Sequence, residues 1–173
     1  MAGCVLNTAR LVAGRRLRLP RARVGVRVRF ADGTSAWMYR ETVVAGRAAA
    51  EPCVLVVAFR LRFVRGWGHA LFRAESLLNT PLFVGFPGFV SKLWLTHDER
   101  GAYRGIYQWD GPDRAERYAR ALWRVLALGS VPGSIAYRDA PGLRRDAVLA
   151  NPRRLAEIAP TDDASWWRVT AVT

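Results

Sequence analysis

Residues 89–109 read FVSKLWLTHDERGAYRGIYQW, and this stretch decides the fold of the chain. Two runs of aromatic and aliphatic residues, 89–97 and 102–109, flank the polar segment DERG at 98–101. Aromatic and branched side chains favour strands, and short polar segments with Asp and Gly favour turns. The stretch therefore predicts two antiparallel strands joined as a hairpin.

A helix is expected directly after this hairpin, from Pro112 to a stop at Gly129. Proline suits the first helical position, where its missing N–H is not needed, and glycine suits the residue after the last turn. Apolar residues recur close to every 3.6 positions, while the arginines fall largely on the other side and are expected to face solvent. The apolar stripe consists of Ala115, Tyr118, Ala119, Leu122, Val125 and Leu126.

The order of the predicted elements indicates an α+β fold. Residues 53–64 (CVLVVAFRLRFV) predict a long strand, residues 69–78 a short helix, and residues 133–140 a last strand. With the hairpin and helix between them, the order is β-α-β-β-α-β. Two such split units form a four-stranded antiparallel sheet with both helices on one face. We therefore predict a ferredoxin-like domain over residues 53–140.

The remaining residues are expected to flank this domain. Residues 1–23 are rich in Arg and free of acids, which predicts a flexible basic leader. Residues 24–52 combine an alternating VGVRVRF segment with an Asp-Gly turn, which predicts a β-hairpin extension and a linker. Residues 141–173 are expected to form a C-terminal tail with one amphipathic turn near 144–150. Its Trp166-Trp167 pair is expected to dock on the body or on a partner subunit.

The formal net charge of +13 is carried by Arg and a single Lys, Lys92. Such a charge makes nucleic acid or an acidic membrane surface the first partners to consider. Eight Arg lie in residues 1–30, and the others are scattered, often close to Asp or Glu. The near-absence of Lys is more typical of a GC-rich bacterial genome than of a phosphate-binding surface. We therefore do not expect nucleic acid as a partner, and we expect a cytoplasmic protein without a membrane span.

Three segments carry a resemblance to a known family: PGFVSKLWL at 87–95, YRGIYQW at 103–109, and Ala115 with Tyr118-Ala119. Residues 86–140 resemble the monooxygenase branch of the dimeric α/β-barrel superfamily, which includes antibiotic-biosynthesis monooxygenases and small polyketide cyclases. In this superfamily a second copy covers the open face of the sheet and closes a barrel, which implies a homodimer. The scaffold hosts oxygenation, cyclisation, isomerisation and haem degradation, so the resemblance implies a fold but no single reaction.

No metal or nucleotide cofactor is expected from the sequence. His69 and His97 fall on different elements, and Cys4 and Cys53 have no metal-ligand spacing. The RGWGH segment at 65–69 has the position of a phosphate loop but an indole where the phosphate would need room.

His69 and Glu75 are the candidate catalytic residues. Trp67 and His69 follow the first strand, at the mouth between that strand and the first helix. Glu75 shares a helical stripe with Leu71 and Leu78, and a carboxyl that is desolvated there would have a raised pKa and could transfer protons. The alternatives stay open: a histidine bonded to backbone at a helix start, and a glutamate paired on the surface.

One face of the predicted sheet mixes aromatic rings and cations. Two-residue alternation places Lys92 with Trp94, and Tyr107 with Trp109. The rings could stack a planar ligand, and the cations could hold its enolate or carboxylate. Alternatively, the aromatic side chains only fill a dimer barrel. The candidate substrate-binding residues are Trp67, Arg60, Arg62, Lys92, Trp94, Tyr107 and Trp109.

Two functions are consistent with these residues. The first is an enzyme that acts on a hydrophobic, aromatic or polyketide-like molecule of secondary metabolism without metal or nucleotide, as a monooxygenase, a cyclase or an isomerase. The second is a non-catalytic small-molecule-binding or interaction protein on the same scaffold. A closed aromatic cavity that contains a titratable group beside a cation would favour the enzyme.

Overall fold

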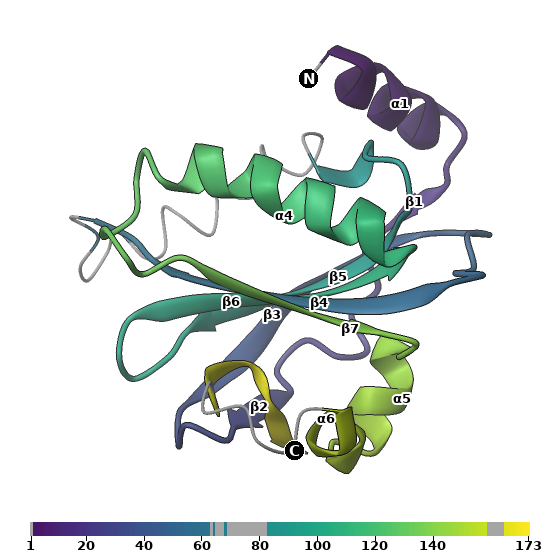
Figure 1. The fold of residues 1–173 in the computed structure, drawn as a ribbon. Coiled ribbons are helices and arrows are strands. Elements are labelled where there is room, and N and C mark those ends of the chain that lie inside the picture. Colours follow the sequence, from purple (N-terminus) through teal and green to yellow (C-terminus); the bar gives the residue numbers. More distant parts are fainter. Residues whose placement is uncertain (1, 63, 65–67, 69–82, 159–164) are drawn as a thin grey trace.

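The computed structural model describes residues 2–62, 64, 68, 83–158 and 165–173 (Figure 1). Its strands are β1 (Leu17–Arg18), β2 (Arg27–Phe30), β3 (Ser35–Val44), β4 (Pro52–Arg60), β5 (Phe89–His97), β6 (Ala102–Asp110), β7 (Ala136–Pro141) and β8 (Val169–Val172). Its helices are α1 (Ala2–Ala13), α4 (Pro112–Leu126), α5 (Arg145–Ala150) and α6 (Arg153–Ile158), with a 3₁₀ turn η1 (Ser165–Trp167). No helix among the described residues has the length and apolar character that a membrane crossing requires.

Four neighbouring strands form the ferredoxin-like unit. The sheet has the order β7-β4-β6-β5-β3-β2-β8, and each neighbouring pair is antiparallel. Within the unit, β7 lies beside β4, β6 lies on the other side of β4, and β5 lies beyond β6. Helix α4 connects β6 to β7 across one face of the sheet (Figure 1). This arrangement confirms the predicted α+β, ferredoxin-like fold, while the helix expected over residues 69–78 lies outside the described residues.

The predicted N-terminal hairpin is present and extends the same sheet. Strands β2 and β3 pair with each other, and β3 also pairs with β5. The Asp-Gly turn forms as expected: Gly33 has a φ of 82°, and the Asp32 carboxylate accepts a hydrogen bond of 3.0 Å from the Thr34 N–H. Glycine adopts positive φ without a steric penalty, so this turn is specified locally. The pairing of β3 with β5 places the hairpin beside the ferredoxin-like unit.

The sheet has an apolar core on each face. On the α4 face, side chains such as Leu55, Tyr107 and Trp109 pack against the helix. On the opposite face, Val54 and Ile106 belong to a second core. Strands β2 and β8, at one end of the sheet, lie over this second face, and α5, α6 and η1 complete its cover (Figure 1).

This cover corrects the expectation of an open sheet face for a dimer. The Trp167 side chain of the tail is almost fully buried in the second core, together with Val169 of β8. The tail thus docks on the body of its own chain, and its helix α5 confirms the amphipathic turn predicted near residues 144–150. The chain itself buries the apolar area that a second copy was expected to bury, so the face that would close a dimer barrel is occupied.

The basic leader also differs from its expected flexible state. Residues 2–13 form α1, and β1 pairs with the end of β3. Leu11 is only 4% exposed and joins the α4-side core. The Asn7 side chain donates a hydrogen bond of 2.8 Å to the Gly85 carbonyl, and a Cβ at Gly85 would lie 1.8 Å from the Cys4 carbonyl oxygen. The helix therefore packs closely on the body, because Gly85 has no side chain and leaves room for the backbone of α1.

Candidate functional site

The only lysine of the chain, Lys92, is buried on the α4 face of the sheet, with 6% of its surface exposed. Its Nζ atom lies 3.1 Å from the centroid of the Trp94 ring, 4.7 Å from that of Tyr107 and 5.0 Å from that of Phe83. Strands β5 and β6 supply the first two rings, and Phe83 precedes β5. We call Lys92 and these three rings the Lys92 cluster.

A glycine on β6 makes room for this lysine. Gly105 is the cross-strand partner of Trp94. A Cβ atom at Gly105 would lie 3.1 Å from Lys92 Cε and 2.9 Å from Tyr107 Cε2. Any larger residue would therefore displace the lysine or the tyrosine. The local sequence YRGIY thus has a steric role that only the sheet register reveals.

The protonation state of Lys92 is set by its surroundings. Burial lowers the pKa of Lys92 well below its ordinary value of 10.5, and the nearby Arg40 guanidinium lowers it further. The aromatic rings favour the ammonium by about 0.5–2 kcal/mol, whereas burial can shift a lysine pKa by about 3–5 units. Within the described residues, no carboxylate forms an ion pair with Lys92. Burial and Arg40 thus both act in favour of the neutral amine, the form that can act as a base or a nucleophile.

Arg40 is a second cation at this site, and the sequence did not indicate it. Its guanidinium carbon lies 3.8 Å from the centroid of the Trp94 ring, and burial lowers the pKa of Arg40. The Trp94 indole N–H donates a hydrogen bond of 3.0 Å to Thr42 Oγ1, which orients the ring. Arg40 and Thr42 both come from β3, so no local pattern could have placed them beside Trp94.

Further aromatic side chains pack next to Tyr107. The hydroxyls of Tyr107 and Tyr118 lie 3.3 Å apart, and burial raises the pKa of both groups. Trp109 is fully buried, and its ring centroid lies 4.7 Å from that of Tyr118. The structure thus brings together three predicted residues, Lys92, Trp94 and Tyr107, and assigns Trp109 to the core beneath them. Tyr118 was not among the candidate site residues predicted from the sequence.

Arg60 and Arg62 lie away from the Lys92 cluster. Arg60 is exposed at the end of β4, opposite Ala102 of β6. Five strand positions separate Ala102 from Tyr107, or roughly 17 Å along β6. Arg62 donates hydrogen bonds of 3.1 and 2.9 Å to the Ser130 carbonyl. These two arginines therefore do not contribute cations to this site.

Three of the predicted site residues, Trp67, His69 and Glu75, lie outside the described residues. Their roles stay predictions.

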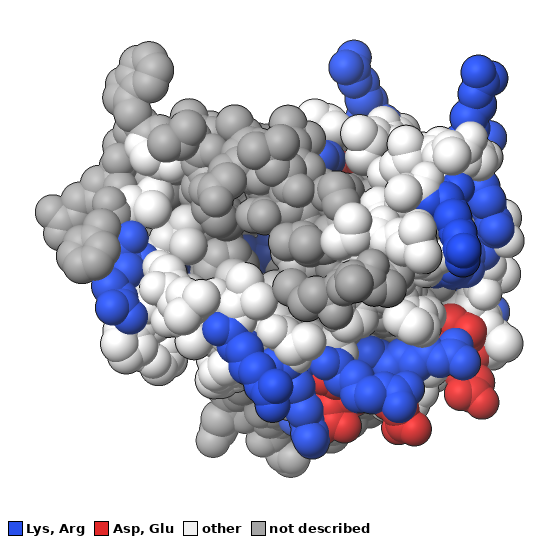
Figure 2. Space-filling model, turned by 90° about the horizontal axis from the view of Figure 1, so that it is seen from above, with Lys and Arg blue, Asp and Glu red and all other residues white. Residues whose placement is uncertain are grey.

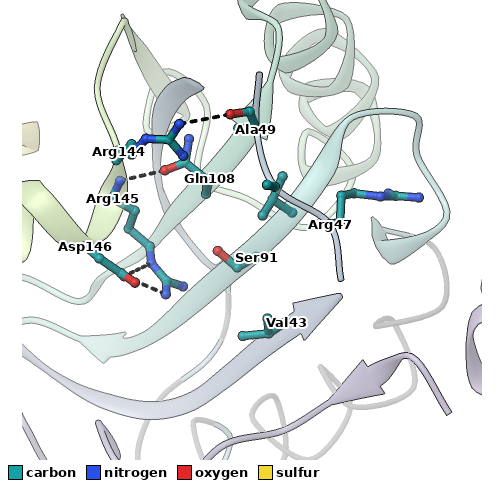
Figure 3. Close-up of a pocket in the computed structure, with 10 residues that line it drawn as sticks. Val43, Arg47, Ala49, Ser91, Gln108, Arg144, Arg145 and Asp146 are labelled. Carbon is teal, nitrogen blue, oxygen red and sulfur yellow. Dashed lines mark hydrogen bonds and ion pairs between the residues drawn. The ribbon is translucent and has the colours of Figure 1, made fainter. Parts of the chain in front are cut away.

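A separate pocket of about 210 Å³ lies between the sheet and the start of α5 (Figure 3). Three arginines line it, but each guanidinium group already bonds to a carbonyl or carboxylate of the same chain. Arg47 donates to the Phe89 carbonyl, Arg144 to the Ala49 carbonyl, and buried Arg145 pairs with Glu41 at 2.6 Å. In Figure 3, Arg47 extends away from Arg144. Arg145 joins the tail to β3, Arg144 joins it to the connection between β3 and β4, and Arg47 joins that connection to β5, so the three cations do not converge on one point.

The described residues contain no group of three or more His, Cys, Asp and Glu side chains that could hold a metal ion. Cys53 is fully buried, and burial raises its pKa to about 11. It therefore stays a protonated thiol at neutral pH.

No protein-family model and no curated protein matches the sequence. Among solved structures, the chain is similar to an uncharacterised ferredoxin-fold protein from Listeria monocytogenes 4b F2365 that is related to antibiotic biosynthesis monooxygenases, with 13% identity and a TM-score of 0.47. It is also similar to a major regulator of staphylococcal pathogenesis (11%, 0.42) and to an anthrone oxidase-like protein (13%, 0.38).

The alignments cover 65%, 62% and 65% of this chain, and 66%, 66% and 58% of the three structures, which is less than two thirds of each. These TM-scores are too low to support a fold assignment. The evidence for the ferredoxin-like fold is the strand order of the sheet itself.

Proposed function

We propose that the protein binds a small, planar, hydrophobic molecule at the Lys92 cluster and removes a proton from it with the neutral Lys92 amine. The observation that carries this proposal is a buried amine among three aromatic rings, beside a second cation and without a described carboxylate partner. Strongly perturbed titratable groups in aromatic surroundings are typical of functional sites.

The geometry also supplies a place for the proton. When Nζ takes a proton from an acidic C–H or a phenol, the resulting ammonium lies 3.1 Å from the Trp94 ring centroid. The ring stabilises a cation at its face, and this stabilisation arises only after the transfer. The product is a carbanion or enolate from the C–H, or a phenolate from the phenol, and its electron-rich carbon can react with dioxygen or close a ring. Oxygenation and cyclisation therefore share this first step, with no metal or nucleotide cofactor.

The proposal is tested with a tricyclic phenolic ketone that carries an acidic ring C–H. The wild-type protein should bind the probe, with quenching of tryptophan fluorescence, and should produce the absorbance band of the enolate. Lys92→Met keeps the length of the side chain but removes the amine, so it should bind the probe without producing the band. Arg60→Gln is the matched control and should behave like the wild type, because Arg60 lies away from the cluster.

Two results would reject the catalytic proposal. If Lys92→Met still produced the enolate, Lys92 would not be the base. If the wild type bound the probe without ionising or converting it, the alternative function, a non-catalytic small-molecule-binding protein, would hold.

His69 and Glu75 remain proposed catalytic residues, with Trp67 as a ring that stacks the ligand. We infer that they supply further proton transfers to the intermediate formed at Lys92. His69→Ala and Glu75→Gln should then lower turnover and leave the melting temperature unchanged, whereas Trp67→Ala should weaken binding by about 1–3 kcal/mol. Wild-type turnover in both polar variants would exclude these roles.

A cytoplasmic homodimer remains part of the proposal, with a changed contact surface. Because β8, α5 and η1 cover the apolar sheet face, two copies would have to meet elsewhere. Light scattering at micromolar concentration should give twice the 19.3 kDa mass of one chain. A stable mass of one chain would exclude the dimer.

A further inference from the structure

Helix α1 carries its more apolar face on the outside. Its inner face presents Cys4, Asn7, Thr8 and Leu11 to the body, and the side chains of Asn7 and Thr8 are polar. Three larger apolar side chains point outward: Val5, Leu6 and Val12, which are 47%, 56% and 55% exposed. A surface helix normally has the opposite arrangement, with its apolar stripe toward the core.

Arginines border this apolar face. Arg10 lies on α1, and Arg15, Arg16 and Arg18 follow the helix, all of them exposed. The chain has no acid before Asp32, and none of these four arginines forms an ion pair with a described carboxylate. Figure 2 views the molecule from the side on which α1 lies, and cationic side chains project there beside uncharged surface. The face therefore combines exposed apolar area with uncompensated positive charge.

Leu19, which follows β1, is a further exposed apolar side chain near the N-terminus in sequence, with 52% of its area exposed. In Figure 1, α1 lies at the upper edge of the molecule, above the right-hand part of α4. Among the described elements, α5 and α6 lie on the opposite side of the sheet and do not cover the outer face of α1.

We propose that α1 and the arginines after it dock on the surface of an anionic phospholipid membrane. The helix would lie parallel to the surface, with Val5, Leu6 and Val12 at the boundary between headgroups and acyl chains. The arginines would extend to the phosphates, because their alkyl stems tolerate apolar surroundings while the guanidinium stays at the interface. This is reversible, peripheral binding by a twelve-residue helix, and it is independent of the proposed function at Lys92.

The test is flotation of the full chain with vesicles of phosphatidylcholine, with and without phosphatidylglycerol. We expect binding to the anionic vesicles alone, and weaker binding as the salt concentration rises. The double variant Leu6→Asp, Val12→Asp should lose binding, because it places charges in the apolar face. The double variant Arg10→Gln, Arg15→Gln should bind about twenty-five-fold more weakly, the product of about fivefold for each arginine near the surface.

Two matched controls use sites away from α1. Leu128→Asp changes a leucine that is 85% exposed beyond the far end of α4. The double variant Arg153→Gln, Arg154→Gln removes two exposed arginines from α6, on the other side of the sheet. Both controls should bind anionic vesicles like the wild type, and equal melting temperatures for all variants would show that they fold.

Other occupants of the face would overturn the proposal with distinct results. A complex of two chains that Leu6→Asp, Val12→Asp converts to one chain, without vesicle binding, would assign the face to a second copy. Binding to random duplex DNA that Arg10→Gln, Arg15→Gln weakens, again without vesicle binding, would assign it to nucleic acid. Vesicle binding that is unchanged in Leu6→Asp, Val12→Asp would exclude the apolar face from the contact.

Discussion

At the scale of single residues, the properties of the candidate site depend on one buried amine and on the space left for it. The rings of Trp94 and Tyr107 enclose the Lys92 amine, which distinguishes it from an ordinary exposed lysine on a strand. Gly105 provides the space, because a side chain there would meet both Lys92 and Tyr107. Each of these two residues leads to a prediction.

The pKa of Lys92 should be measurable without ambiguity, because the chain has only one lysine. We expect the ¹⁵Nζ resonance to titrate well below 10.5, since burial and Arg40 both oppose the charge. The pKa of a lysine in an unfolded chain is about 10.4. A midpoint near the ordinary value would contradict the neutral-amine site.

The lowered pKa also sets a pH dependence of stability. Between the folded and the unfolded pKa of Lys92, the unfolded chain binds more protons. The free energy of unfolding should therefore rise with pH in that window, by up to about 1.4 kcal/mol per pH unit. Below the folded pKa both states are protonated, and this contribution to the slope vanishes. Urea titrations of the wild type and Lys92→Met should differ by this slope.

Gly105→Ala should destabilise the fold by about 1–3 kcal/mol, the usual cost of an additional methyl group in a packed core. The added Cβ would lie 2.9 Å from Tyr107 Cε2, which is too close for a real contact. Gly129→Ala is the control, because a Cβ there meets nothing within 4 Å. Chemical denaturation measures both changes, and equal midpoints would show that the site can relax around the methyl group.

At the scale of secondary-structure elements, the N-terminal segment takes part in the fold. Helix α1 and strand β1 attach to the body through Leu11, through the Asn7 contact with Gly85, and through pairing with β3. The flexible leader predicted from the sequence would allow removal of the residues before Arg23 without a change in melting temperature. The structure predicts a lower melting temperature instead, because the truncation removes buried contacts.

Two adjacent residues of α1 separate the packed face from the outer face. Leu11→Ala should lower the free energy of unfolding by about 2–5 kcal/mol, because Leu11 is 4% exposed. Val12→Ala should change it by less than about 0.5 kcal/mol, since its side chain is 55% exposed. Equal effects in urea titrations would mean that α1 does not pack on the body as the structure shows.

At the scale of the whole molecule, Arg104 links segments that are far apart in the chain. It lies on β6, on the sheet face opposite α4, and its side chain is almost fully buried. Its guanidinium pairs with Asp98 at 2.6 Å and with Asp32 at 2.8 Å, and it donates to the Trp166 carbonyl at 3.0 Å. The hairpin turn, the β5–β6 turn and the C-terminal tail thus meet at one cation.

Arg104→Met should therefore cost about 3–5 kcal/mol, because it leaves carboxylates in a buried site without their cation. Arg120→Met removes an exposed partner of Glu116 on α4 and should cost less than about 0.5 kcal/mol. Thermal or urea unfolding measures both variants. Similar small losses in the two would show that the carboxylates of Asp32 and Asp98 find water or other donors.

The elements that local patterns specify were predicted correctly. The hairpin at residues 89–109, helix α4 and the Asp-Gly turn each follow from residues a few positions apart. The pairing of Lys92 with Trp94 on one face likewise follows from two-residue alternation. The β-α-β-β-α-β order then limited the sheet to few topologies, which is why the ferredoxin-like fold was accessible from sequence.

The sequence by itself determined the elements, their order and the residues that share a face of each strand, because these depend on short-range sterics and periodicity. The tertiary structure alone decided that β3 borders β5, so that Arg40 reaches Trp94, and that the tail covers the second sheet face. It alone also placed Arg60 and Arg62 away from the cluster. Periodicity shows which side chains point the same way, but the distant segment that packs against them depends on the free energy of the whole chain.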